Sequence, residues 1–441
     1  NKSYVLEHGD YEITLNTDAH TVVDSKTVTV EKDIIYNDEN DGKRSTDKVA
    51  ATNQFDDARG EVTYLSRENG FANYEEATAA PGNIEMTEEE MQVYIAKNTF
   101  DAADYDDPDA EMPTTGADNG LTIQDMKGLD YDDEKWDKLL DQLTVDEMST
   151  LVADGGFHMV GIDSVNSPET TDCDGPAAIS SNFNSSIKGS AFPSAVVIAS
   201  TWNKELAKER GTEMCKECYG PAMNIHRSAF SGRNFEYYSE DGTLSGFMGG
   251  NEVAGATEQG VMTYVKHFAM NDQETNRTNG LCTWATEQSI REIYLKGFER
   301  AFKDGKSLAV MSSFNSIGAR WAGSNSSLLQ SVLRDEWGFH GAVDTDAMDP
   351  LADFYMDLNS GIRTGLTHGL SMTGGDGLIE NTDQAGTVIA LREAAHENLY
   401  AVANSNAMDK ETGTPDWVKI FIGADVAVLL LLAIGEYLVI R

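Results

Sequence analysis

Polar and apolar residues alternate along the first 75 residues of the chain. The alternation is clearest at Tyr11–Leu15, Thr27–Val30 and Glu61–Tyr64, and Gly, Asn and Asp residues separate these runs. A period of two indicates β-strands, because successive side chains of a strand point to opposite faces. The region is too short and irregular for a complete β-sandwich. We therefore predict that residues 1–75 form a partial β-rich segment similar to the end of a sandwich.

Residues 76–133 are acidic, contain prolines and show one short helical pattern near Thr87–Met91. The acidic side chains are densest from Asp33 to Asp47 and from Glu85 to Asp118. Such stretches are typical of solvated loops. We predict that residues 76–133 are an acidic linker, or a segment that wraps over the next domain.

The pattern changes near Trp136. Thr144 precedes an apolar-periodic run with acids in its first turn, as expected for a helix start. Short apolar runs then alternate with longer amphipathic ones. The short runs are Ala195–Ile198, Val261–Val265, Ser307–Met311 and Gly341–Val343, and the longer ones are Trp202–Cys218, Leu244–Gly255, Ser289–Lys303 and Leu328–Trp337. Strands alternating with helices across residues 134–408 predict an α/β fold, a (β/α)8 TIM-type barrel, which usually takes ~250 residues.

The C-terminal residues are almost entirely apolar from Ile420 to Ile440, between Lys419 and Arg441. A run of ~20 apolar residues is long enough to cross a bilayer. Asp425 and Glu436 oppose this interpretation, because a charge near the membrane centre costs ~3 kcal/mol. We predict a transmembrane helix over residues 417–441, with a buried or amphipathic terminal helix as the alternative.

The chain of 441 residues carries 33 Lys and Arg against 74 Asp and Glu, a formal net charge of −41. A surface this negative repels nucleic acids, so we expect no nucleic-acid partner, whereas neutral sugars are compatible with it. Four cysteines do not make a disulfide framework in a chain of this length. Cys215 and Cys218 are predicted to share one helix turn. No His-x-His motif occurs, which argues against a metal-dependent barrel hydrolase. We expect neither a metal nor an organic cofactor.

Residues suited to sugar binding follow the apolar runs. Asp346 ends the run that begins at Gly341, Lys266 and His267 follow Val265, and Arg233 lies in a nearby polar motif. In a (β/α)8 barrel the catalytic residues lie at the carboxyl ends of the strands. Asp, Arg, Lys and His at such ends can hold sugar hydroxyls by short hydrogen bonds. The pattern therefore predicts glycoside chemistry.

These motifs resemble family 3 glycoside hydrolases, in the β-glucosidase branch, over about Leu143 to Met408. The resemblance implies that Asp346 is the catalytic nucleophile. Asp174, in the Asp-Gly-Pro motif, Arg233, Lys266 and His267 are implied to hold the sugar ring. Phe314 stands where many relatives carry a Tyr near the nucleophile, and we expect it to form an aromatic wall of the substrate site.

Each of these residues also has a structural interpretation. Asp346 could cap a helix after a strand, and Asp174 could be a turn residue. Neighbouring residues on a strand normally face opposite sides, so Lys266 and His267 can serve one site only where the backbone is irregular. His267 is otherwise expected in the core.

The same family takes its acid/base Glu from a second sandwich domain. The chain after Tyr400 offers a short linker and the apolar tail, so we expect this domain upstream of Asn1. Relatives with such a permuted order have a fibronectin type III-like module before the barrel, and residues 1–75 are similar to the end of one. We assign no acid/base residue in this chain.

The resemblance implies a retaining β-glycosidase, with terminal β-linked glucosyl residues as the expected substrate. The apolar C-terminal run predicts that it is anchored to a membrane, and the abundant acids and lack of cysteine pairing are compatible with a bacterial cell surface. One alternative is a non-catalytic, membrane-anchored sugar-binding protein. A family 3 β-xylosidase is another. An N-acetylhexosaminidase is opposed by the residues after His267, because Ala269–Glu274 replaces the Pro-Gly continuation of that branch.

Overall fold

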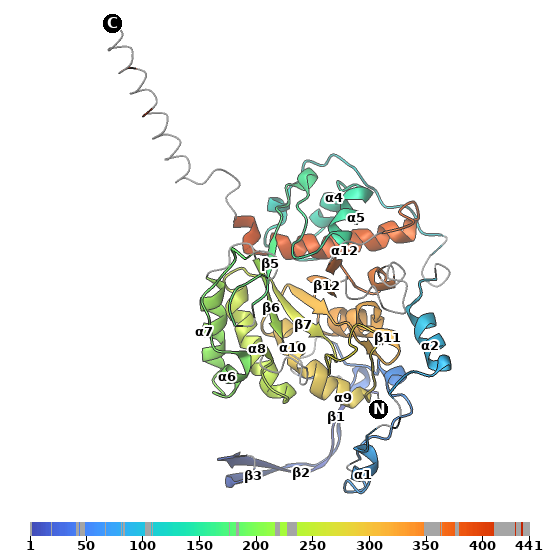
Figure 1. Cartoon of the computed structure of the whole chain (residues 1–441), viewed down its shortest axis with the longest axis vertical. Coiled ribbons are helices and arrows are strands. Elements are labelled where there is room, and N and C mark those ends of the chain that lie inside the picture. Colours follow the sequence, from blue (N-terminus) through green and yellow to red (C-terminus); the bar gives the residue numbers. More distant parts are fainter. Residues whose placement is uncertain are drawn as a thin grey trace.

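The computed structural model of the chain has a parallel β-sheet at its centre (Figure 1). It describes all residues except 1, 19, 41–43, 45–48, 67, 81, 83, 102–106, 108, 176, 182–184, 217–220, 227–235, 348–361, 363, 375–378, 410–427, 429–433 and 435–441, and the side chains of residues 221–226. The strand order is β13 (Met372–Gly374), β12 (Ala342–Ala347), β9 (Ala309–Ser312), β7 (Thr263–Phe268), β6 (Pro221–His226) and β5 (Thr171–Cys173). Every neighbouring pair runs parallel.

The end of helix α5 (Val145–Ala153) and the loop after it contact both edge strands of this sheet. The Asp172 N–H of β5 donates to the Phe157 carbonyl at 2.8 Å. The Thr373 hydroxyl of β13 donates to the Ala153 carbonyl, also at 2.8 Å. The arrangement is a TIM-barrel-type α/β fold, which confirms the predicted class. The prediction of eight β/α units is not reproduced in the described residues, where the parallel sheet has six strands.

Side chains alternate between the two faces of the sheet, and both faces are buried. Val265, Val310 and Val343 belong to a hydrophobic core that also contains residues of the surrounding helices. Their neighbours Tyr264 and Ala309 belong to a second cluster on the other face. A parallel sheet covered by helices buries both faces in this way, and its strands therefore read as continuous apolar runs.

The amphipathic runs predicted as helices are helical. The covering helices are α5 (Val145–Ala153), α7 (Lys204–Cys215), α8 (Gly242–Thr257), α9 (Glu287–Ser289), η6 (Ile290–Tyr294), α10 (Leu295–Lys303), η8 (Ser327–Glu336) and α12 (Ala385–Ala403). One predicted strand is wrong, because Ala195–Ile198 belongs to the helix α6 (Ala195–Ala199). Val196 and Val197 are exposed there, on the outer side of the helix. Short apolar runs cannot be assigned to strand or helix by periodicity alone.

Helices α7 and α8 cross at a close backbone contact. A Cβ atom at Gly211 would lie 2.1 Å from the Glu252 carbonyl, so only glycine fits this crossing. The Glu252 side chain is buried, and it accepts hydrogen bonds from Arg210 of α7 and from the Tyr238 hydroxyl. This buried network fixes the position of Tyr238 against α8. The neighbouring residue, Tyr237, contacts His267 of β7.

The N-terminal region contains two ribbons and no packed sandwich among its described residues. β1 (Tyr4–Leu6) pairs with β4 (Ile34–Tyr36), and β2 (Gly9–Asn16) pairs with β3 (Val22–Val30), both antiparallel. Ile13 and Leu15 on β2 are more than 60% exposed, so no second sheet among the described residues covers them. The predicted strand at Glu61–Tyr64 is wrong, since this stretch is irregular.

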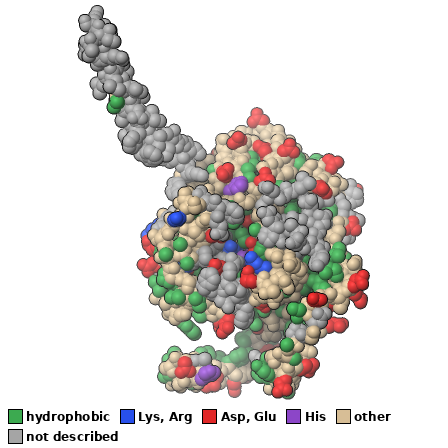
Figure 2. Space-filling model, viewed as in Figure 1, with side chains coloured by type: hydrophobic (Ala, Val, Ile, Leu, Met, Phe, Trp, Pro, Cys, Tyr) green, Lys and Arg blue, Asp and Glu red, His purple; other side chains and the backbone are tan. Residues whose placement is uncertain are grey.

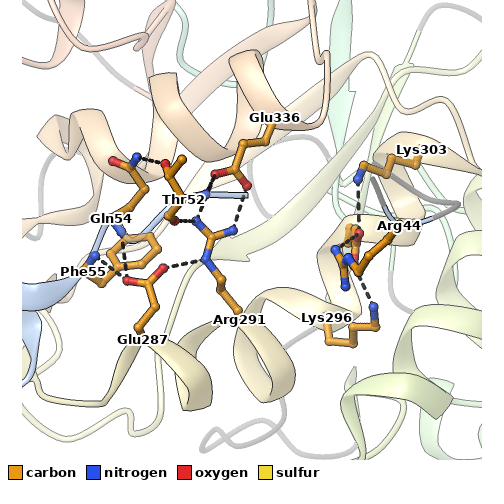
Figure 3. Close-up of polar contacts among 10 residues, drawn as sticks. Arg44, Thr52, Gln54, Phe55, Glu287, Arg291, Lys296, Lys303 and Glu336 are labelled. Carbon is orange, nitrogen blue, oxygen red and sulfur yellow. Dashed lines mark hydrogen bonds and ion pairs between the residues drawn. The ribbon is translucent and has the colours of Figure 1, made fainter. Parts of the chain in front are cut away.

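Residues 52–55 are tied to the barrel helices by Arg291 (Figure 3). The Arg291 guanidinium donates to both carboxylate oxygens of Glu336, at 2.7 and 3.0 Å, and to the Thr52 carbonyl at 2.6 Å. Its Nε donates to Glu287, whose other oxygen accepts the backbone N–H of Phe55 at 2.6 Å. These buried charges hold an extended segment against two helices that are distant in the sequence.

A second charged cluster lies on α10. Glu299 is buried and is surrounded by three cations: Lys296 at 2.8 Å, Lys303 at 3.1 Å and Arg44 at 3.1 Å (Figure 3). Arg44 also stacks on the ring of Tyr4, 3.5 Å from its centroid. Arg44 therefore links the β1–β4 ribbon to the barrel.

The acidic segment after residue 76 lies against loops of the barrel. Helix α2 (Glu88–Asn98) begins with a capping box, in which Thr87 and Glu90 bond reciprocally to each other's backbone. At its other end, the Asn98 side chain bonds the Ala319 carbonyl and the Trp321 N–H, both at 2.8 Å. Trp321 is buried, so α2 supports the loop that follows β9.

The predicted membrane helix, residues 417–441, lies outside the described residues apart from Val428 and Ile434. Within the part of the chain that the structure describes, no helix is both long enough and apolar enough to cross a membrane.

A stack of three rings joins the acidic segment to α12 and to the residue two positions before β12. The Tyr131 ring lies 3.9 Å from that of His396 and 4.4 Å from that of His340, measured between centroids. Burial lowers the pKa of His396 from 6.5 to about 4, and the positive charge of Arg392 adds to this effect. The neutral imidazole is therefore the form that fits the folded protein.

Folding stability is expected to decrease as the pH falls through the window from about 6.5 to 4. In that window the unfolded chain takes up a proton on His396 that the folded chain does not. His396→Phe keeps a ring in the stack and removes the proton site. Between pH 7.5 and pH 5 the wild type should lose about 2 kcal/mol more than this variant in urea unfolding. The difference at pH 7.5 measures packing alone, and equal losses for both proteins would contradict the expectation.

Candidate active site

Asp346 lies near the carboxyl end of β12, on the inner face of the sheet. Val343 of the same strand packs into the hydrophobic cluster that contains Val265 and Val310. Because side chains alternate along a strand, Asp344 and Asp346 point to the opposite, inner face of the sheet. Asp344 is 4% exposed, and the Asp346 side chain is 14% exposed. The second carboxylate therefore reaches the open end of the barrel, while the first is enclosed below it.

Two basic side chains face the same oxygen of Asp346. His267 Nε2 lies 3.4 Å from Asp346 Oδ2, and Arg277 Nη1 lies 3.6 Å from it. Nearby positive charge favours the ionised form of a carboxylate. Asp346 is thus a partly exposed carboxylate with Arg277 and His267 beside one of its oxygens.

Lys266 and His267 are adjacent in β7, and the backbone there is irregular. The register between β7 and β9 shifts between Val265 and Phe268. The peptide bonds Lys266–His267 and Phe268–Ala269 are cis. Both side chains are buried, Lys266 near the carboxyl group of Asp344 and His267 beside Asp346.

A tyrosine outside the sheet orients His267. The Tyr237 hydroxyl lies 3.3 Å from His267 Nδ1, on the side of the ring opposite Asp346. Tyr238, bonded to Glu252, anchors this part of the chain. A partner on Nδ1 sets which nitrogen of the imidazole carries the proton, and it fixes the ring that faces the carboxylate.

A buried polar layer lies beneath Asp346. Burial raises the pKa of Asp344 well above its usual range, and the carboxyl groups of Asp172 and Asp346 add to the shift, while Lys266 opposes it. Burial also raises the pKa of Tyr264, followed by the charges of Asp172 and Asp344. The layer favours a neutral Asp344, which limits charge repulsion on Asp346.

Arg277 lies on the loop that follows β7 and contacts three elements of the site. Its Nε is 3.1 Å from a carboxylate oxygen of Glu274, and its Cζ stands 4.7 Å from the centroid of the Phe314 ring. Phe314, just after β9, is 2% exposed. The Phe314 ring is therefore buried and carries an arginine on its face, and its predicted role as a wall of the substrate site stays a prediction.

The other predicted residues have different outcomes. Asp174 follows β5 directly, at the same edge of the sheet as His267 and Asp346, and it forms an isolated bridge with Ser180. Arg233 lies outside the described residues. The structure thus brings together Asp346, Lys266, His267 and Phe314, and it places Asp174 at the same end of the sheet.

Sequence reasoning missed Asp172, Tyr237 and Arg277. Asp172 is two residues before Asp174, and the period of two could have placed both on one face. No local pattern marks Tyr237 or Arg277, because the contacts that matter join them to β7 and β12 through space.

The chain carries a formal net charge of −41. In Figure 2, red carboxylate atoms are spread over the visible face, and a few basic atoms gather near its centre among grey atoms.

Comparison with known proteins identifies similar sequences. Residues 181–373 match the sequence model of the glycosyl hydrolase family 3 N terminal domain. The chain is 38% identical over 222 residues to β-glucosidase A of Butyrivibrio fibrisolvens, in an alignment that covers 46% of this chain and 26% of that protein. It is 36% identical over 222 residues to an exo-α-(1→6)-L-arabinopyranosidase of Bifidobacterium longum, covering 46% of this chain and 29% of that protein.

The fold can also be compared with the solved structure of a similar protein. β-Glucosidase 3B from Thermotoga neapolitana, in complex with glucose, superposes with a TM-score of 0.52 at 32% identity, over 65% of this chain and 45% of that one. The chain therefore spans less than half of the length of each of these three proteins.

Proposed function

We propose that this chain, which belongs to glycosyl hydrolase family 3, is the barrel part of a retaining β-glycosidase that acts on terminal β-linked glucosyl residues. The observation that carries the proposal is the carboxylate of Asp346, placed at a strand end with His267 and Arg277 within 3.6 Å. The β-glucosidases among the relatives support glucose as the sugar.

In the proposed reaction, an Asp346 oxygen attacks the anomeric carbon and the bond to the aglycone oxygen breaks. A second carboxyl group protonates the departing oxygen, and a covalent glycosyl-aspartate forms. The same carboxylate then removes a proton from water, which attacks the anomeric carbon and releases Asp346. Asp174, Arg233, Lys266 and His267 are proposed to hold the ring hydroxyls.

We propose that the second carboxyl group comes from a region present in the longer relatives and not in this chain. Two described carboxyl groups of this region are otherwise engaged. Asp344 is enclosed beneath the site, and Glu274 is paired with Arg277. The upstream sandwich domain and the membrane anchor at residues 417–441 remain proposals that rest on the sequence.

The sugar itself has a second candidate. A relative named for an arabinopyranoside is almost as similar as the β-glucosidase. A β-xyloside is also compatible with the same ring contacts. A panel of aryl glycosides that differ only in the sugar distinguishes these cases by relative kcat/KM.

Covalent trapping tests the proposed function directly. The chain is incubated with 2,4-dinitrophenyl 2-deoxy-2-fluoro-β-glucoside, whose leaving group departs without a general acid, and the adduct is located by peptide mass spectrometry. We expect one adduct on Asp346. A folded chain that binds glucose and forms no adduct would instead support a non-catalytic sugar-binding protein.

A further inference from the structure

We infer that Asp272 is a positioning residue for the reaction of Asp346: its protonated carboxyl group, bonded by the Tyr294 hydroxyl, holds the loop that follows β7 in place beside the site. This loop, residues 269–281, joins β7 to β8 (Cys282–Thr283) and is named the β7 loop. The inference rests on the proposed function and deepens it, because it adds a pH dependence that lies outside the reacting groups.

Asp272 lies midway along the chain between two residues that contact Asp346. His267 precedes it at the end of β7 and Arg277 follows it in the β7 loop, and both lie within 3.6 Å of Asp346 Oδ2. The sheet fixes His267, whereas Arg277 is placed by the course of the loop. A contact that fixes the loop at Asp272 therefore also restricts where Arg277 lies.

One hydrogen bond ties the β7 loop to the surrounding helices. The Tyr294 hydroxyl donates to Asp272 Oδ2 at 2.7 Å. Tyr294 belongs to η6, and its side chain packs against the core cluster that contains Val265 and Phe268 of β7. η6 is a short π-helix, a form that is rare and is frequent at functional sites. The donor is thus held by the core, and the loop is held by the donor.

The second oxygen of Asp272 favours the protonated form of the side chain. Oδ1 is shielded from solvent and accepts no hydrogen bond from the described residues. A buried carboxylate oxygen without a donor is costly when it carries charge, and a proton removes that charge. Burial raises the pKa of Asp272 from 3.8 to about 6, and the hydrogen bond from Tyr294 opposes the shift. Above this pH the ionised group is drawn toward water.

The β7 loop begins in a strained conformation that needs such support. Met270 has a φ of +67°, in the left-handed region that residues other than glycine rarely adopt. Its carbonyl accepts the Asp272 N–H at 3.0 Å and the Thr283 hydroxyl at 3.2 Å. A strained residue keeps its conformation only where the surrounding contacts impose it. Release of the Asp272 side chain therefore lets the start of the loop relax.

The charged residues of the two joined elements are engaged with one another. They are Glu274 and Arg277 on the β7 loop, and Arg291 and Glu292 on η6. Glu274 lies 3.1 Å from Arg277 Nε. Arg291 pairs with Glu287 and Glu336. The arginines of both elements thus face other carboxylates, while the group that bonds Asp272 is the neutral hydroxyl of Tyr294.

The first test follows the rate of labelling by the dinitrophenyl 2-fluoro-glucoside from pH 4.5 to 8 in the wild type and in D272N. A group with a pKa of about 6 keeps its proton in only about 3% of molecules at pH 7.5. The wild-type rate should therefore fall as the pH rises above 6. Asparagine keeps the acceptor for Tyr294 and does not ionise, so D272N should match the wild type at pH 5 and exceed it about 10-fold at pH 7.5.

Two further variants control this comparison. Y294F removes the donor at every pH, so it should label about 10-fold more slowly than the wild type at pH 5 and at a similar rate at pH 8. Asp335 is an exposed aspartate that also accepts one side-chain hydrogen bond, from Gln330 at 2.9 Å, and D335N should reproduce the wild-type profile. His267 is present in every variant, so its own titration cannot produce the difference. A D272N profile that falls above pH 6 as in the wild type would overturn the inference.

A measurement without any reaction separates this inference from the proposed function. Hydrogen exchange of peptides from the β7 loop is followed by mass spectrometry at pH 5 and pH 7.5, corrected for the chemical exchange rate, with peptides from α12 as the reference. Protection of the loop should fall about 10-fold between these pH values in the wild type and stay constant in D272N. This pattern without labelling would refute the function alone. Labelling with equal loop protection at both pH values would refute the role of Asp272.

Discussion

Replacement of Asp346 by Ala is expected to abolish covalent labelling and to lower the release of dinitrophenol from 2,4-dinitrophenyl β-glucoside by on the order of 10⁴-fold or more. The side chain is the partly exposed carboxylate between His267 and Arg277. A good leaving group needs no general acid, so the loss reports the nucleophile and not the acid/base. The measurement is the initial rate by absorbance on purified full-length chain.

Added azide gives a second test of whether Asp346 is the nucleophile. Azide can enter the space left by the carboxylate of Asp346 in the Ala variant and attack the anomeric carbon from the same side, releasing dinitrophenolate. The expected product is the α-glucosyl azide, and its formation should restore a measurable rate. D304A, at an exposed carboxylate on the outer surface, serves as the control and should retain wild-type activity. Adduct formation in D346A at the wild-type rate would show that another group is the nucleophile.

Removal of the Arg291 side chain is expected to cause the largest loss of stability. Arg291 is 7% exposed, and it donates to two carboxylates and to the Thr52 carbonyl (Figure 3). R291L leaves Glu336, itself 5% exposed, as an unpaired buried charge. Breaking a buried pair by removing one partner costs about 3–5 kcal/mol. Urea unfolding followed by circular dichroism measures this loss.

Two further variants show whether the loss of stability comes from the buried charge pair. R291L/E336L removes both members of the buried pair and should recover part of the stability, because no buried Glu336 is left uncompensated. K208Q breaks the exposed pair between Lys208 and Glu258, whose side chains are 41% and 57% exposed, and should cost less than ~1 kcal/mol. A loss in R291L no larger than that in K208Q would show that the buried cluster does not hold residues 52–55 to the barrel.

Most of the fold class followed from local patterns. The apolar runs near Val265, Val310 and Val343 indicated parallel strands, because a strand covered on both faces has few polar positions. Ala195–Ile198 was assigned wrongly, since a run of four apolar residues fits either a strand or a buried helix turn. The strands β2 and β3 were predicted correctly, but the packed sandwich predicted around them is not present among the described residues. The pairing of two neighbouring strands is local in the sequence, whereas the packing of one sheet on another is not.

For the candidate site, the sequence indicated some of the residues but not how they are arranged. Asp346, Lys266 and His267 were marked by their places after apolar runs, where a barrel collects its chemistry. Their mutual geometry was not predictable, because adjacent residues on a regular strand face opposite sides and the register shift in β7 is a tertiary feature. No sequence pattern indicated Tyr237, because its contact with His267 joins two separate parts of the chain.

By itself, the sequence determined the strands β7, β9 and β12, the helices around them, the acidic composition and the residue types at the ends of these strands. Those features depend on the period of side chains and on composition, which are local. Only the tertiary structure decided that Arg277 faces Asp346 from the surface of Phe314, and that Arg291 ties residues 52–55 to the barrel. Both arrangements join residues far apart in the chain, and their strength comes from the burial that folding creates.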